Sequence, residues 1–136
     1  MDIVNSEYSD LKVICADDCG NAPKKVLLKE LTIAFTKNDI DFITKVISDN
    51  VCWDMIGDKM IQGKDNLVEM LKQKKIRTVT EIHISNIITH GSTGAVNGTL
   101  IFENKKSYAF CDVYNFTSAG KHAKIKEIAS YVIKIS

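Results

Sequence analysis

The sequence predicts a single α+β domain in which three helices precede a mostly antiparallel sheet. In the first half of the chain, apolar residues recur three and four positions apart, which is typical of amphipathic helices. From Thr78 onward, runs rich in β-branched residues alternate apolar and polar side chains and are separated by short turn sequences. A chain of 136 residues with 45% hydrophobic and 26% charged residues has the size and composition of one globular domain.

The N-terminal segment is expected to be separate from this domain. Residues 1–20 are predicted to form a helical arm, because Leu11 and Ile14 belong to a weak apolar stripe and Asp17–Gly20 supplies a stop. Residues 21–136 are predicted to form the domain itself. No linker, repeat or low-complexity segment divides them.

A bent pair of helices is expected to begin the domain. Pro23 fits the first turn of a helix that runs to about Thr36. Asn38 or Asp39 is the expected cap of a second, shorter helix that ends near Ser48. The elements expected after this pair are a strand over 50–56, a helix over 65–74, and strands over 78–90, 95–103, 106–116 and 123–135.

The strand over 106–116 is the most informative part of the chain. Its alternation puts four aromatic rings and one carboxylate, that of Asp112, on the same face. The rings belong to Tyr108, Phe110, Tyr114 and Phe116. A carboxylate among aromatic rings is costly to leave charged without a partner, so Asp112 is a candidate functional residue. The alternative is that Asp112 caps a loop or pairs with a lysine at the end of the strand.

Charge and residue usage argue against several classes of function. Eighteen basic and seventeen acidic residues give a formal charge of +1, so nothing suggests a nucleic-acid partner. No apolar run is long enough to span a membrane, and no signal peptide is visible, so a cytoplasmic location is expected. The four cysteines are expected to be reduced thiols there. The three histidines lack metal-ligand spacing, and we expect neither a metal nor a cofactor.

Three local motifs resemble the nuclear transport factor 2-like superfamily, which includes SnoaL-like polyketide cyclases and ketosteroid isomerases. They are LTIAFTKNDIDFITKVISDNVCW, WDMIGDKMIQGKDNL and CDVYNFTSAGKHAKIKEIASY, and the resemblance covers about residues 23–135. It implies a cone-shaped, cystatin-like fold in which a curved sheet wraps around a helix and leaves an apolar pocket open at one end. It also implies a homodimer that pairs through the outer face of the sheet.

The isomerase pattern can be carried over residue by residue. The motif CWDMIG puts Asp54 at the position of the general base, and DVYNF puts Asp112 at that of the oxyanion-hole acid. Leu31 occupies the region of the isomerase's oxyanion-hole tyrosine, so the second donor to an enolate is missing. The residues expected to line the pocket are Leu31, Trp53, Leu100, Phe102, Tyr108, Phe110, Tyr114 and Phe116. The alternative interpretation of Asp54 is an exposed acid at the end of a strand. The alternative interpretation of Trp53 is a residue of the core or of an interface.

Three functions are compatible with these features. The first is binding of a small apolar or aromatic molecule in the pocket. The second is isomerase- or cyclase-like proton abstraction next to a carbonyl, with Asp54 as base and Asp112 as oxyanion donor. The third is an association module that uses the sheet face and has a vestigial pocket.

Overall fold

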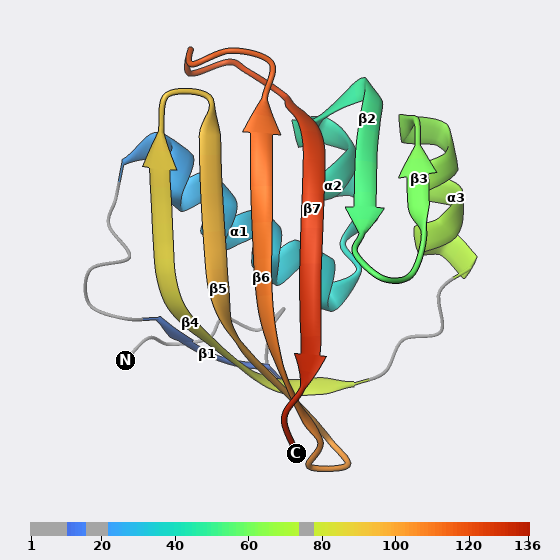
Figure 1. Cartoon of the computed structure of the whole chain (residues 1–136), viewed down its shortest axis with the longest axis vertical. Helices are drawn as coiled ribbons and strands as arrows, with labels where there is room; N and C mark the ends of the chain where they lie inside the picture. Colours follow the sequence, from blue (N-terminus) through green and yellow to red (C-terminus); the bar gives the residue numbers. More distant parts are fainter. Residues whose placement is uncertain (1–10, 16–21, 74–77) are drawn as a thin grey trace.

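The predicted aromatic strand lies in the middle of the sheet, as β6 (Ser107–Phe116). The computed structural model describes residues 11–15, 22–73 and 78–136. In that part of the chain the elements are, in order, β1 (Lys12–Cys15), α1 (Pro23–Lys37), α2 (Ile40–Val46), β2 (Ile47–Met55), β3 (Met60–Gln62), α3 (Lys64–Gln73), β4 (Val79–His90), β5 (Thr93–Phe102), β6 and β7 (Ile125–Lys134). The described strands form one sheet in the order β1-β4-β5-β6-β7-β2-β3 (Figure 1). The α+β class predicted from sequence is confirmed.

The bent helix pair depends on two cap residues. Asn38 adopts a left-handed conformation (φ 60°, ψ 44°) and ends α1, and its backbone N–H bonds to the carbonyls of Ala34 and Phe35. The next residue, Asp39, accepts a hydrogen bond from the backbone N–H of Phe42 and so caps α2. The chain therefore reverses between the two helices without an intervening loop.

Helix α1 packs against the concave side of the sheet. Its buried side chains include Leu28, Leu31 and Thr32, and Figure 1 shows it crossing behind β4, β5, β6 and β7. Together with inward-facing residues of the strands, these side chains form the core. None of the helices in the described ranges is both long enough and apolar enough to cross a bilayer.

The sheet is mostly antiparallel, and it is bent at a glycine. Only β1 with β4 and β2 with β7 pair in parallel among the described strands. The β4–β5 register shifts between Ile84 and Asn86, and Gly98 of β5 lies opposite this bulge. A Cβ atom on Gly98 would overlap the carbonyl oxygen of His83, so the two backbones meet there closely. A bulge increases twist and bends its strand, which helps to curve the sheet around α1.

Two parts of the sequence prediction need correction. The expected helical arm is wrong for Lys12–Cys15, which form a strand parallel to β4, and the rest of that arm lies outside the described residues. Without β1, the edge of β4 would leave its backbone groups unpaired. The β-branched residues Val13 and Ile14 favour an extended strand, which can pair with that edge. The short strand β3 was not predicted, because the segment after Gly57 was interpreted as a turn.

The expectation that all four cysteines are reduced is also wrong. Cys15 is disulfide-bonded, whereas Cys52 and Cys111 are free. Disulfides are more typical of oxidising compartments. The cysteines therefore no longer support the expected cytoplasmic location.

Candidate functional site

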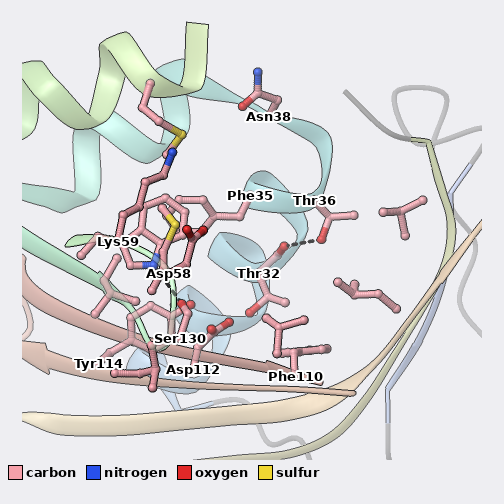
Figure 2. A pocket seen from close by; sticks show the side chains of 18 of the residues that line it. Thr32, Phe35, Thr36, Asn38, Asp58, Lys59, Phe110, Asp112, Tyr114 and Ser130 are labelled. Carbon is pink, nitrogen blue, oxygen red and sulfur yellow. Dashed lines mark hydrogen bonds between the residues drawn. The ribbon is translucent and has the colours of Figure 1, made fainter. Parts of the chain in front are cut away.

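A cavity of about 570 Å³ lies between α1, α3, the β2–β3 turn and the concave face of the sheet (Figure 2). This volume is within the range of about 300–1,000 Å³ that is usual for small-molecule sites. Its apolar lining residues are Phe35, Trp53, Met55, Ile56, Met70, Val79, Leu100, Phe102, Phe110, Ile128 and Val132. Its polar lining residues are Thr32, Thr36, Asn38, Asp58, Lys59, Asp112, Tyr114 and Ser130.

Asp112 is the one acid that β6 turns into this cavity. The strand register puts it between Val96 of β5 and Ser130 of β7. Burial raises the pKa of Asp112 from 3.8 to about 6, and a hydrogen bond with Ser130 partly offsets that rise. No described lysine, arginine or histidine forms an ion pair with Asp112. The carboxyl therefore faces the cavity in a poorly hydrated place without a cationic partner from the described chain.

Asp112 ends a short chain of hydrogen bonds. The indole Nε1 of Trp53 donates to the hydroxyl oxygen of Ser130 over 2.8 Å. Because an indole N–H can only donate, Ser130 must accept from it and has its own proton left for Asp112. The chain of bonds fixes one side of the Asp112 carboxyl and leaves its remaining acceptor capacity directed at the cavity.

Tyr114 provides a second polar group at the same end of the cavity. Burial raises the pKa of the Tyr114 hydroxyl well above 10, Asp112 adds to the rise, and a hydrogen bond with Thr32 opposes it. The Thr32 hydroxyl itself donates to the carbonyl oxygen of Leu28 over 2.7 Å. The proton of Thr32 is thus committed to the helix backbone. Tyr114 stays protonated at all physiological pH values.

The structure does not bring Asp54 to this cavity. Its neighbours Trp53 and Met55 both line the cavity, and Asp54 does not. Successive side chains of a strand point to opposite faces, so Asp54 lies on the outer side of β2. The expectation that Asp54 and Asp112 face the same cavity is therefore not met. The described acid that shares the cavity with Asp112 is Asp58, in the turn between β2 and β3.

The eight residues expected to line the pocket divide into two groups. Those that line the cavity are Trp53, Leu100, Phe102, Phe110 and Tyr114. Leu31 and Phe116 are buried core residues outside it, and Tyr108 instead packs edge-on against the ring of Phe102, with centroids 5.4 Å apart. The ammonium of Lys24 lies 5.1 Å from the ring centroid of Phe116, so that ring has a cationic neighbour instead of a ligand.

The sequence analysis missed several lining residues, among them the polar residues Ser130, Thr32 and Asn38. Ser130 could have been found, because it shares strand parity with the buried residue Ile128. Thr32 gives no sequence signal beyond its place on the inner side of α1. The sequence identifies Asn38 as a cap only, yet its Nδ2 donates to the carbonyl oxygen of Leu71 over 3.0 Å, and its buried Oδ1 has no partner among the described residues.

Within the described residues, no three His, Cys, Asp or Glu side chains group closely enough to hold a metal ion. The polar groups that line the cavity are the carboxyls of Asp58 and Asp112, the ammonium of Lys59, the Asn38 amide and several hydroxyls. A carboxyl with a pKa of about 6 can accept a hydrogen bond or a proton at neutral pH and donate one in mild acid.

Comparison with known proteins identifies the fold. No protein-family model and no curated protein sequence matches the chain. Among solved structures, a nuclear transport factor 2-like protein of unknown function from Cytophaga hutchinsonii is 21% identical, with a TM-score of 0.59 over 79% of this chain and 97% of that one.

Two further structures superpose more closely. A proposed SnoaL-like polyketide cyclase from Shewanella denitrificans has a TM-score of 0.69 at 10% identity, over 82% of this chain and 91% of that one. A proposed ketosteroid isomerase from Kribbella flavida has a TM-score of 0.67 at 7% identity, over 84% of this chain and 80% of that one. Identities this low bear on architecture alone. The chain has the nuclear transport factor 2-like fold.

Proposed function

We propose that this protein binds a small apolar or aromatic molecule in the cavity described above. The observation that carries the proposal is a cavity of about 570 Å³ with mostly apolar walls and a single inward carboxyl on β6. Apolar walls with a few fixed polar groups are the usual form of a small-molecule site. Two proteins with the same fold are named for ketosteroid and polyketide chemistry, which concerns small organic molecules of this kind.

Trp53 supplies a direct readout, because it is the one tryptophan in the chain and it lines the cavity. Aromatic and steroid-like compounds that absorb little at 295 nm should change its fluorescence on titration. A Thr36→Phe variant should abolish this change, since a ring at that position of α1 would occupy the cavity. The matched control is Thr44→Phe, on α2 outside the cavity. Thr36 and Thr44 each donate to a carbonyl of their own helix, so both variants lose the same kind of bond.

Saturable fluorescence changes in wild type and Thr44→Phe, but not in Thr36→Phe, are the expected result. Equal responses in all three proteins would mean that the compounds bind elsewhere, and the proposal would fail. A cavity that binds nothing across a range of ligand sizes would instead favour a vestigial pocket and the association module.

Acid–base chemistry at Asp112 is a second proposal, and one specific observation favours it. A pKa of about 6 is close to working pH, where a carboxyl is most effective at transferring protons. The expected role of Asp54 as the base has no support from its position on the outer side of β2, so Asp112 is the proposed proton-transfer group. The test is exchange of protons next to a carbonyl in heavy water, followed by NMR with cyclic ketones as substrates. Exchange that survives Asp112→Asn would refute the proposal, and Asp54→Asn should leave exchange unchanged.

Pairing of two copies through the outer sheet face is a third proposal. Tyr131 and Ile133 on β7 are 45% and 66% exposed, and their outward neighbours on β6 are Cys111 and Ala109. Exposed apolar side chains on a continuous sheet face are typical of interfaces. An Ile133→Glu variant should shift sedimentation from dimer to monomer. A monomeric wild type would refute the proposal.

A further inference from the structure

Four hydrogen-bond donors that line the cavity are already committed to other protein atoms. The Thr36 hydroxyl donates to the carbonyl of Thr32 over 2.8 Å, and the Thr32 hydroxyl donates to Leu28. The Trp53 indole donates to Ser130, as described above. Ser130 uses its own proton on Asp112. These side chains therefore have no proton left for a ligand.

The acceptors, in contrast, are not used up. Asn38 turns its amide nitrogen to the carbonyl of Leu71, and because a carbonyl can only accept, this bond fixes the orientation of the amide. The amide oxygen of Asn38 is left buried and without a partner in the part of the chain that is described. Asp112 has one donor, Ser130, for a carboxyl that can accept several hydrogen bonds. Figure 2 shows Asn38 and Asp112 on opposite sides of the cavity.

The walls next to these acceptors are aromatic. Phe35 and Trp53 form a tilted pair with centroids 4.8 Å apart, and Phe102, Phe110 and Tyr114 line the same space. The faces of aromatic rings attract cations, especially where water is excluded. An anionic group among such rings, with no ion pair to a described cation, matches an organic ammonium ion better than it matches a neutral or acidic molecule.

We propose that the ligand of this cavity is an aromatic or apolar amine, whose ammonium group pairs with the Asp112 carboxylate. This inference rests on the proposed binding function and names the class of its ligand. A ligand whose carbonyl oxygen bonds to Asp112 requires the opposite, a protonated Asp112 that donates, so these two modes of binding have opposite pH dependence.

The charged and titratable groups near Asp112 define what else can titrate in such a test. On β6 they are Tyr114 and Cys111, and burial raises the pKa of both. At the cavity, the β2–β3 turn adds Asp58 and Lys59. From α1, β5 and β7 the side chains beside it are Thr32, Val96 and Ser130, none of which is charged.

The experiment compares three probes that share one phenylbutyl group: 4-phenylbutylamine, 4-phenylbutan-1-ol and 4-phenylbutyric acid. Binding is measured by calorimetry and by Trp53 fluorescence at pH 7.5. A charge-assisted hydrogen bond in a desolvated site contributes about 1.5–3 kcal/mol, so the amine should bind about 10- to 100-fold more tightly than the alcohol. The acid should bind more weakly than either.

Variants and pH separate the contribution of Asp112 from that of the phenyl ring. Asp112→Asn should reduce the affinity for the amine about tenfold or more and leave that for the alcohol nearly unchanged. The matched control is Asp54→Asn, which makes the same chemical change on the outer side of β2 and should bind all three probes like wild type. Between pH 7.5 and pH 5, wild-type affinity for the amine should fall about tenfold as Asp112 takes up a proton, because an alkylammonium stays charged throughout.

The possible failures are distinguishable. Equal affinity for the amine and the alcohol, or an affinity for the amine that rises toward pH 5, would overturn this inference and leave the binding function standing. No binding of any probe would overturn both. If Asp112→Asn does not fold, the probe series and the pH series on wild type still decide the matter.

Discussion

The position of Asp112 predicts that one substitution makes the protein more stable at neutral pH. Asp112→Asn keeps the shape of the side chain but cannot ionise. In the folded protein, burial raises the pKa of this carboxyl from 3.8 to about 6. At about 1.4 kcal/mol per pKa unit, that difference corresponds to on the order of 3 kcal/mol.

The sign follows from proton binding. Below pH 3.8 the carboxyl is protonated in both the folded and the unfolded chain, so its ionisation has no effect on stability. Between pH 3.8 and about 6 the unfolded chain loses the proton and the folded chain keeps it, so stability falls as the pH rises. Above about pH 6 the full loss of about 3 kcal/mol remains. Relative to wild type, Asp112→Asn should therefore gain about 3 kcal/mol in its free energy of unfolding between pH 3.5 and pH 7.5.

Urea unfolding followed by Trp53 fluorescence at pH 3.5, 4.5, 5.5, 6.5 and 7.5 measures this difference. Any constant effect of the asparagine, such as an altered bond to Ser130, shifts all points equally and does not affect the slope. Asp54→Asn is the control, since it removes a carboxyl outside the cavity. If the difference in free energy of unfolding between wild type and Asp112→Asn changes by less than about 1 kcal/mol from pH 3.5 to pH 7.5, Asp112 is not desolvated.

Three further substitutions test other parts of the structure. Gly98→Ala should destabilise the protein by more than about 2 kcal/mol in urea unfolding, because its Cβ would overlap a β4 carbonyl, whereas Gly120→Ala should change stability by less than about 0.5 kcal/mol. Similar values for the two would contradict the close approach at the bulge. Asn38→Ala should lower the melting temperature more than Asn38→Gly, because only glycine adopts φ 60° without strain, and the reverse order would be inconsistent with that cap. Ser130→Ala removes a hydrogen bond that stabilises the Asp112 carboxylate, so NMR titration should give a pKa above about 6, and a lower value would rule out that bond.

The central strand was predictable because its pattern has only one interpretation. Alternation between Tyr108 and Phe116 requires that Asp112 share a face with Phe110 and Tyr114, and all three line the cavity. The same rule, applied to β2, would have separated Asp54 from Trp53, because neighbouring residues of a strand face opposite ways. The family resemblance placed Asp54 in the pocket in spite of that alternation. Where the two disagreed, strand parity was the better guide.

The missed elements depend on contacts that are distant in sequence. The strand Lys12–Cys15 is four residues long and is defined by pairing with β4, which begins more than sixty residues later. The three-residue strand β3 likewise exists through its pairing with β2. Short strands carry too little periodicity to be read from sequence. The orientation of the Asn38 amide likewise depends on α3, which brings the carbonyl of Leu71 to the amide nitrogen.

The destabilising carboxyl and the free acceptors have one explanation in common. An asparagine at position 112 would avoid a penalty of about 3 kcal/mol, so a protein selected for stability alone gains nothing from Asp112. A bound ammonium ion would favour the ionised carboxyl and bring its pKa back toward 3.8, which removes the penalty. Saturating 4-phenylbutylamine should therefore flatten the fall in wild-type stability between pH 3.8 and about 6 and leave the pH dependence of Asp112→Asn as it was. Stabilisation by the amine that is equal in both proteins at every pH would mean that the penalty and the ligand are unrelated.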